Sequence, residues 1–172
     1  MRVTLREWEA SDAPALATLA NDRRIWLGLR DAFPHPYSID DAHRFIERAC
    51  GMTPRTYFAI LAEGRLAGGI GYTLRGDVER VGAEVGYWLG VEFWGQGITT
   101  EAVRHLTWLA FTTHPELCRL YAVPYSTNAA SARVLEKAGY TREGTLRESA
   151  IKDGHVLDQF MYSILRREAA PA

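Results

Sequence analysis

Hydrophobic and polar residues alternate at the start of the chain and then recur at a helical period. The alternation from Val3 to Glu7 predicts a strand. Capping residues at Ser11-Asp12 and a proline at position 14 precede apolar positions spaced three and four residues apart, so a helix is expected next. A second helix is predicted between Ser38 and Cys50, where apolar residues again share one helical face.

Short extended segments fill the middle of the chain. Thr56 to Ala62 and Ala67 to Leu74 flank a Glu-Gly-Arg turn, which predicts a β-hairpin. A third strand of the same block is expected from Ala83 to Leu89, after a polar turn. The three segments together predict an antiparallel meander.

Helices and strands alternate in the second half. The predicted elements are a helix from Thr99 to Thr113, a strand from Leu120 to Val123, a helix from Ala129 to Ala138 that stops at Gly139, and strands from Tyr140 to Arg147 and from Val156 to Leu165. The complete order predicts an α/β (α+β) fold with a single mixed sheet of about seven strands and about four flanking helices.

Length and composition narrow the class of protein. The 172 residues suit one domain, expected over residues 1–168, with a short tail at 169–172 that belongs to a frayed end beginning near Arg166. With 20 Lys and Arg against 21 Asp and Glu, the net charge of -1 offers no excess of positive charge for a nucleic-acid partner. The apolar runs are too short for a membrane span, and the N-terminus lacks the apolar stretch of a signal peptide.

The cysteines and histidines add two expectations. Cys50 and Cys118 are far apart in sequence, which favours a reduced compartment, and a cytoplasmic location is therefore expected. The five histidines show no ligand-like spacing, so no metal site is expected.

A strand feeds into a helix through two close glycines, Gly95 and Gly97. Without Cβ atoms, these positions let backbone N–H groups approach a phosphate, and the helix dipole adds positive potential. A tight turn without a ligand is the alternative, and the incomplete G-x-G-x-x-G pattern argues against a dinucleotide site. The residues of this candidate phosphate loop are Gly95, Gln96, Gly97, Ile98, Thr99 and Thr100.

A second block, Asn128 to Tyr140, follows a buried strand and opens another helix. Together with the block from Gly86 to Ala102, it resembles the GNAT superfamily of acetyl-CoA-dependent N-acetyltransferases, in particular the RimJ/RimL-like branch, which modifies ribosomal-protein N-termini and many small amines. The resemblance spans nearly the whole chain. It departs from the superfamily pattern Q/R-x-x-G-x-G/A at Trp94, which is usual for the branch, and at Thr99.

The resemblance implies a cofactor site. The sheet would splay at its centre, and the pantetheine arm of acetyl-CoA would lie along Tyr87, Trp88 and Leu89 like an extra strand. The pyrophosphate would rest on the candidate phosphate loop, and Asn128 would hold the arm from the opposite strand-to-helix junction. Acetyl-CoA is thus the expected co-substrate, with no metal.

Amide formation needs a neutral amine, a place for charge on the carbonyl oxygen and a proton for the leaving thiolate. Glu84 lies in an otherwise apolar strand and is the candidate base; a glutamate that faces solvent or pairs with an arginine is the alternative. Many superfamily members use a tyrosine as the acid, but this chain has Leu135 there. Ser131 is therefore favoured as the acid over Tyr140, although Ser131 could only cap its helix and Tyr140 could belong to the core.

The acceptor is an amine, either a peptide N-terminus or a small molecule, between which the sequence does not choose. By the resemblance, Trp26, Phe33 and Tyr37 would wall its pocket, with packing roles as the alternative. The protein is expected to be a monomer or a homodimer. A non-catalytic acyl-CoA-binding module is the rival function, and a thioesterase-like hydrolase comes third.

Overall fold

The structure, a computed structural model, describes residues 2–169. Its strands are β1 (Val3–Glu7), β2 (Tyr57–Ala62), β3 (Arg65–Leu74), β4 (Gly82–Leu89), β5 (Arg119–Ala122), β6 (Thr141–Lys152) and β7 (His155–Leu165). Its α-helices are α1 (Ala13–Ala20), α2 (Arg23–Trp26), α3 (Ile39–Gly51), α4 (Ile98–Thr113) and α5 (Ala129–Lys137). Residues 2–169 also contain four short 3₁₀ helices: η1 (Ala10–Asp12), η2 (Asp77–Glu79), η3 (Val91–Phe93) and η4 (Arg166–Glu168).

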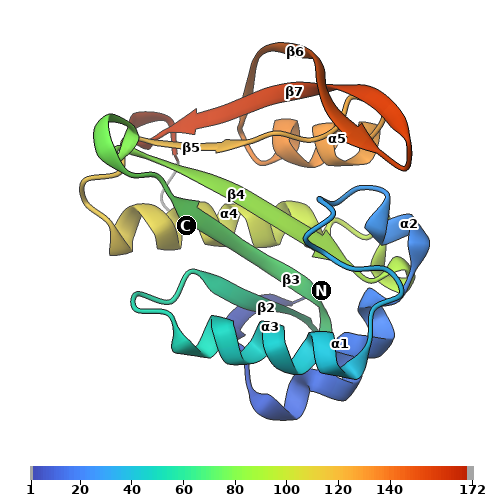
Figure 1. Cartoon of the computed structure of the whole chain (residues 1–172). Coiled ribbons are helices and arrows are strands. Elements are labelled where there is room, and N and C mark those ends of the chain that lie inside the picture. Colours follow the sequence, from blue (N-terminus) through green and yellow to red (C-terminus); the bar gives the residue numbers. More distant parts are fainter. Residues whose placement is uncertain (1, 170–172) are drawn as a thin grey trace. The chain divides into compact units, whose positions relative to one another are not determined.

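All seven of these strands join one sheet in the order β1-β2-β3-β4-β5-β7-β6 (Figure 1). The pairs β1–β2, β2–β3, β5–β7 and β6–β7 are antiparallel, whereas β4 and β5 are parallel. The mixed α/β sheet with flanking helices confirms the predicted fold class. Residues 2–169 contain five α-helices, whereas about four were expected. The additional helix is α2, a single turn of four residues.

The parallel pairing of β4 is short. It joins Gly82–Glu84 to Arg119–Tyr121, and within residues 2–169 it extends no further. The reason is the length of β5, which has four residues and ends at Ala122. Strand β4 continues to Leu89, so its second half runs on beyond the last β5 pair.

The chain forms two compact units, Met1–Gly71 with Tyr87–Ala102, and Tyr72–Gly86 with Val103–Ala172. Three elements, β3, β4 and α4, pass from one unit into the other. The single domain expected over residues 1–168 stays a prediction.

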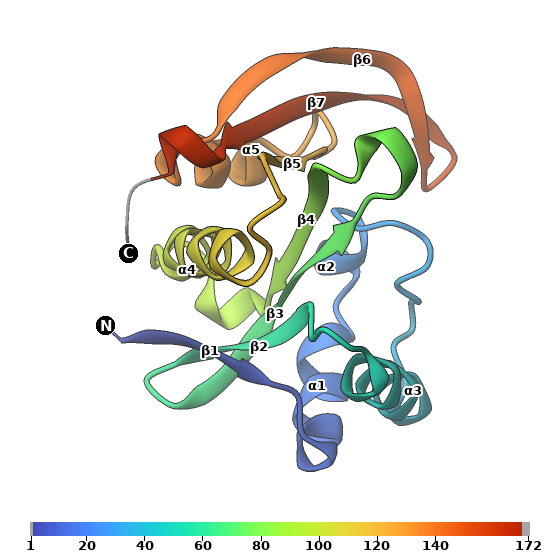
Figure 2. The same ribbon diagram turned by 90° about the vertical axis from the view of Figure 1, so that its left-hand side faces the viewer.

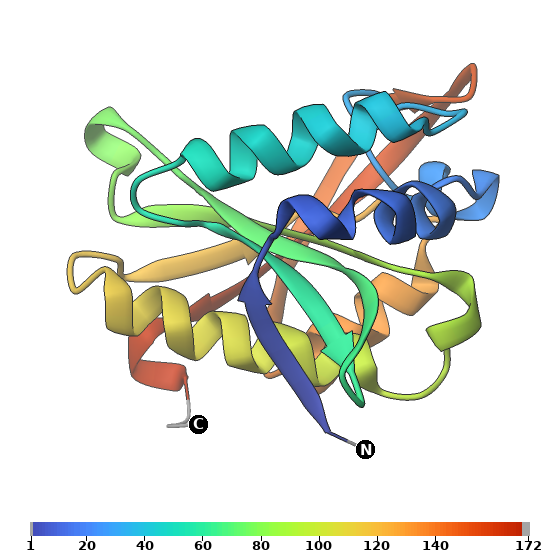
Figure 3. The same ribbon diagram turned by 90° about the horizontal axis from the view of Figure 1, so that it is seen from below.

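In the first unit, α1 and α3 lie side by side next to β1 and β2 (Figures 2 and 3). A capping box fixes the start of α3: the Asp41 backbone N–H donates to Ser38 Oγ (3.2 Å), and the Ser38 N–H donates to Asp41 Oδ2 (2.8 Å). Burial of apolar faces then holds the helices in place. One cluster of the buried core here consists of Trp8, Ala13, Leu16, Ala20, Tyr37, Ala42, Ile46, Ala49 and Ala59.

In the second unit, the β6–β7 hairpin runs alongside α5 (Figure 1). Leu135 of α5 is fully buried, and the carbonyl of the same residue accepts from the Tyr140 N–H (2.9 Å). Gly139 ends the helix with a φ of +95°, a left-handed conformation that suits glycine. The predicted stop of this helix is therefore confirmed.

Two stretches differ from the sequence-based expectations. Strand β6 continues to Lys152, whereas the sequence predicted its end at Arg147. The sequence does not reveal the full length, because almost all residues of β6 are exposed and its register shifts between Leu146 and Ala150, so hydrophobic and polar positions do not alternate regularly. The expectation of a frayed end from Arg166 is wrong for η4. The Arg166 guanidinium donates to the carbonyls of Leu117 (2.7 Å), Phe111 (2.8 Å) and His114 (2.5 Å). Residues 170–172 of that tail lie outside the described residues.

None of the helices in residues 2–169 is both long enough and apolar enough to cross a bilayer. In the same part of the chain, no three His, Cys, Asp or Glu side chains gather in a way that could hold a metal ion.

Candidate functional site

The candidate phosphate loop connects β4 and η3 to the first turn of α4. Gly95 and Gly97 have φ values of +75° and +80°, a region that side chains with a Cβ rarely adopt. No heavy atom of the described chain, other than those of neighbouring residues, lies within 4 Å of a Cβ placed at either position. The backbone of the loop is thus open to an incoming anion beside a helix N-terminus, and the residues present fit a pyrophosphate.

Two side chains fold this loop back onto the residues before it. Trp94 Nε1 donates to the Leu89 carbonyl (2.8 Å), and Gln96 Nε2 donates to the Glu92 carbonyl (3.0 Å). The indole of Trp94 remains 47% exposed. In the sequence, Trp94 is only a departure from a motif. Its hydrogen bond to the Leu89 carbonyl, which ties the loop to the end of β4, could not be predicted from a periodic pattern.

The three predicted pantetheine contacts end β4. Tyr87 and Trp88 are half-buried and Leu89 is buried. The Gly90 N–H donates to the Ala67 carbonyl of β3 (2.8 Å), which fixes the strand at its end. The Leu89 carbonyl is already engaged by Trp94.

Glu84 stands opposite Tyr121 in the last parallel pair between β4 and β5. Its side chain is half-buried in a strand whose neighbours Ala83 and Val85 are buried. The predicted base therefore lies where the parallel pairing of β4 stops.

Asn128 and Ser131 meet at the start of α5. The Ser131 N–H donates to Asn128 Oδ1 (3.0 Å), so Asn128 is the N-cap of the helix. Ser131 lies in the first turn and is half-buried. Helix capping, the alternative role considered for Ser131, is thus present at the start of α5, but the capping side chain is that of Asn128.

Tyr140 follows α5 and is only 3% exposed. Its hydroxyl lies 2.9 Å from Thr107 Oγ1 on α4. Thr107 Oγ1 donates its own proton to the Val103 carbonyl (2.8 Å), so Tyr140 is the donor in the pair. The phenol proton therefore points into the core, which favours a packing role for Tyr140.

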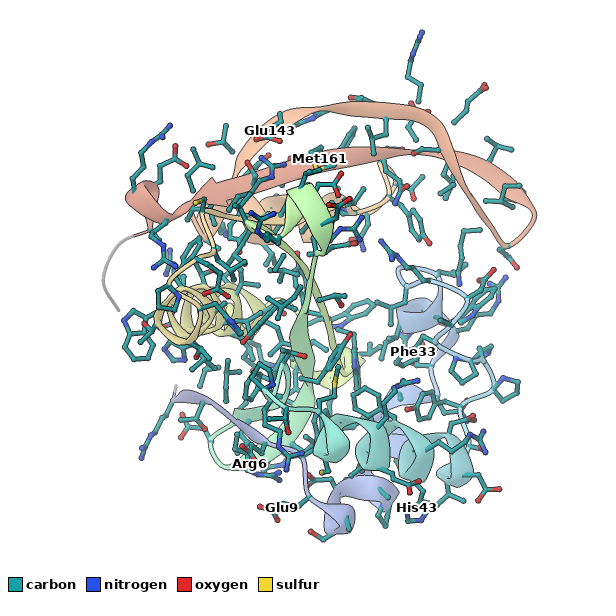
Figure 4. The ribbon with its side chains drawn as sticks, turned by 60° about the vertical axis from the view of Figure 1, so that its left-hand side comes forward. Arg6, Glu9, Phe33, His43, Glu143 and Met161 are labelled. Carbon is teal, nitrogen blue, oxygen red and sulfur yellow. The ribbon has the colours of Figure 1, made fainter. Side chains whose placement is uncertain are left out.

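The three predicted acceptor residues belong to the first unit. Phe33, in the loop between α2 and α3 (Figure 4), has its ring 4.8 Å from Tyr37 and 5.8 Å from Trp88. Burial raises the pKa of Tyr37 to about 12, and its side chain is 6% exposed. Trp26 is half-buried with its ring 5.9 Å from that of His35.

The predicted residues thus fall into two sets. The first unit holds the phosphate loop, the end of β4 and the aromatic residues, with contacts among Phe33, Tyr37 and Trp88. The second unit holds Glu84, Asn128, Ser131 and Tyr140, with contact between the asparagine and the serine.

Residues 2–141 match the family model described as an acetyltransferase (GNAT) domain. YdaF of Bacillus subtilis, whose name provisionally assigns it to the ribosomal N-acetyltransferases, is 34% identical over 96% of this chain and 92% of its own. The uncharacterized N-acetyltransferase p20 of Bacillus licheniformis is 30% identical over 98% and 96%. The solved structure of the microcin C7 self-immunity acetyltransferase MccE with acetyl-CoA and AMP has a TM-score of 0.80 and 27% identity over 95% of this chain and 92% of MccE.

Proposed function

Because this chain belongs to the GNAT family of acetyltransferases, which use acetyl-CoA as co-substrate, we propose that it acetylates the α-amino group of a peptide or protein N-terminus. The observation that carries the proposal is the glycine loop at the start of α4, with left-handed Gly95 and Gly97 and open space beside both, as far as residues 2–169 are concerned. The name of YdaF supports a protein N-terminus as the acceptor, and a small amine is the second candidate.

The chemistry assigned to the residues is a direct attack. The neutral amine nitrogen attacks the thioester carbonyl, the C–N bond forms and the C–S bond breaks, without an acyl-enzyme. The nitrogen then loses one proton to become an amide, and the departing thiolate takes up one proton and leaves as the CoA thiol. Glu84 takes the proton that the ammonium must lose, directly or through water. Ser131 hydrogen-bonds the departing thiolate, and the phosphate-loop N–H groups of Gly95 to Thr100 hold the pyrophosphate.

Asn128, Tyr87, Trp88 and Leu89 hold the pantetheine arm in this proposal, the last three through their backbone. A cytoplasmic location and a monomer or homodimer stay predictions. A non-catalytic acyl-CoA-binding module would bind acetyl-CoA equally well, and a thioesterase would cleave it without an amine.

Thiol release separates these functions. Free CoA is measured with a chromogenic disulfide, after subtracting the signal of the protein's own cysteines, Cys50 and the exposed Cys118. Release only when a peptide is supplied, with the acetyl group on its N-terminal nitrogen by mass spectrometry, is the expected result. Release without an amine would indicate a hydrolase, and binding without any release would indicate the non-catalytic module.

A further inference from the structure

The segment between β5 and α5 continues beside β7 after β5 has ended. The pairing of β5 with β7 stops at Ala122, yet Tyr125 forms an isolated antiparallel bridge with Gln159 in the same register. Pro124 interrupts the ladder between these points, because proline has no backbone N–H to donate. Segment 123–128 thus follows β7 without belonging to β5, and both lie in the second unit.

Backbone hydrogen bonds connect this segment to β7 and to α5. The Phe160 N–H donates to the Pro124 carbonyl (2.9 Å), and the Ser126 N–H donates to the carbonyl of Asp158 (2.9 Å). The Asn128 N–H then donates to the carbonyl three residues before it (2.9 Å). The place of Asn128, the N-cap of α5, is therefore set by the way segment 123–128 lies on β7.

The side chain of Gln159 adds a bond at the start of the segment. Its Nε2 donates to the carbonyl of Val123 (3.1 Å), the residue directly after β5. Its Oε1 accepts from Ser149 Oγ of β6 (3.1 Å), whose proton is shared with the Leu146 carbonyl (3.0 Å). Since β7 lies between β5 and β6 (Figure 1), the half-buried amide of Gln159 joins segment 123–128 to β6 across β7.

Asp158, the residue before Gln159, directs its side chain to a different neighbour. Its Oδ1 accepts from the Glu148 N–H of β6 (2.8 Å). Glu148 has a φ of +49° and lies where the register of β6 shifts against β7. The side-chain bond of Asp158 thus runs to the irregular part of β6, whereas the Nε2 bond of Gln159 runs to segment 123–128. The two adjacent residues form a natural pair for comparison.

We propose that Gln159 is a positioning residue of the cofactor site. By holding the Val123 carbonyl, its amide keeps segment 123–128 in place on β7 and so fixes Asn128 and Ser131 at the start of α5. The inference rests on the proposed acetyltransfer, in which Asn128 holds the pantetheine arm and Ser131 bonds the departing thiolate. Without the amide, the start of α5 samples other arrangements, and affinity falls with the fraction of molecules that are ready to bind.

The experiment compares Gln159→Met with Asp158→Ala. Gln159→Met keeps the length of the side chain and removes its donor; we expect the acetyl-CoA Kd to rise about fivefold and kcat to fall by a similar factor. Asp158→Ala also loses a side-chain hydrogen bond to a backbone group, so both variants should be less stable than the wild type. The Kd and kcat of Asp158→Ala should nevertheless equal the wild-type values. Urea unfolding, calorimetry and thiol release measure the three quantities.

A double-mutant cycle tests whether Gln159 acts through Asn128. Asn128→Asp keeps the helix cap and removes the amide donors proposed to hold the cofactor arm. If Gln159 positions those donors, the loss of acetyl-CoA affinity in the double variant should be smaller than the product of the two single losses. Combining Asp158→Ala with Asn128→Asp should give the loss of Asn128→Asp alone.

Three results would overturn the positioning role and leave acetyltransfer intact: wild-type Kd and kcat in a less stable Gln159→Met, equal losses in Asp158→Ala, or single losses that multiply in full in the cycle. A wild type that binds acetyl-CoA and releases no thiol with either a peptide or a small amine would overturn both. Should Gln159→Met fail to fold, Gln159→Glu makes the same comparison, because it keeps the size and Oε1 but replaces the donating nitrogen with oxygen.

Discussion

Gly97 is the residue on which the phosphate assignment depends most. Its φ of +80° makes any substitution strained, so a loss of binding in Gly97→Val could come from the backbone alone. Gly64, in the turn between β2 and β3, has a φ of +78° and equally open surroundings among the described residues. Gly64→Val therefore carries the same strain away from the loop.

We expect Gly97→Val to weaken acetyl-CoA binding at least about tenfold, or about 1.4 kcal/mol, because a branched side chain would stand against the phosphate. Gly64→Val should bind as the wild type does. Calorimetric titration of both variants measures the difference. Equal affinities in the two folded variants would contradict the loop assignment.

Glu84→Gln removes the proposed base at little change in size. Turnover should fall about a hundredfold, most strongly below the pKa of the amine, where the acceptor arrives charged and must lose a proton. The measurement is the pH dependence of kcat and kcat/KM. An unchanged profile in shape and height would make Glu84 a structural residue of β4.

Ser131 and Tyr140 make opposite predictions. Ser131→Ala should raise the activation free energy of turnover by an amount on the order of 2–3 kcal/mol and so lower kcat, with little effect on acetyl-CoA affinity. Tyr140→Phe loses the buried bond to Thr107 and should cost about 1 kcal/mol of unfolding free energy while kcat stays near that of the wild type. Kinetics and urea unfolding of both variants test the pair; inactive Tyr140→Phe beside active Ser131→Ala would reverse the roles.

At the level of elements, the first turn of α5 combines two functions in one residue. Asn128 caps the helix through Oδ1, and in the proposed function its amide also holds the cofactor arm. Asparagine and aspartate cap about equally well, whereas alanine costs about 1 kcal/mol.

Asn128→Asp thus keeps the cap and replaces the amide N–H donors with a carboxylate oxygen. The variant should unfold like the wild type and bind acetyl-CoA about tenfold more weakly. Thermal unfolding and calorimetry, run beside Asn128→Ala, separate the two effects. Wild-type affinity in Asn128→Asp would restrict Asn128 to its capping role.

Elements with local signals were predictable. Ser38 and Asp41 predict the start of α3, and Gly139 predicts the end of α5. These signals are readable because a capping residue lies next in sequence to the helix that it caps. Strand β6 was predicted too short, since an exposed edge strand with a register shift has no buried face to impose alternation. The glycine loop could also be located from the sequence, because its conformation depends on Gly95 and Gly97, which lie two positions apart.

For the molecule as a whole, the residues that escaped prediction are those whose contacts are distant in sequence. The bonds of Arg166 span 49 to 55 residues, and the approach of Gly69 to Trp88 joins two strands. Neither leaves a periodic trace.

The unfolding free energy of the whole protein should also depend on pH through Glu143. Arg119 donates to both of its carboxylate oxygens (2.6 and 2.7 Å) and Ser163 to one (2.6 Å), which ties β5, β6 and β7 together. The Arg119 hydrogen bonds hold the pKa of Glu143 at about 2, against an ordinary 4.5. A lowered pKa in the folded state stabilises it fully above pH 4.5 and progressively less as the pH falls toward 2.

Glu143→Gln should therefore be less stable than the wild type near neutral pH, and the two should converge between pH 4.5 and 2. Because the Glu143 side chain is 40% exposed, the difference is expected at about 1 kcal/mol or less. Urea unfolding at stepped pH measures it. A gap between the two proteins that stays constant down to pH 2 would show that the ion pair is not its source.

The interleaving of the two units has a consequence for how the chain is made. The first unit needs residues up to Ala102, yet Tyr72–Gly86 of the second unit is synthesised before that point. On the ribosome, Tyr72–Gly86 of the second unit therefore emerges before Tyr87–Ala102, the last segment of the first unit. Neither unit can be expressed as one uninterrupted piece, and separating them would require a circular permutation or a designed linker across the break.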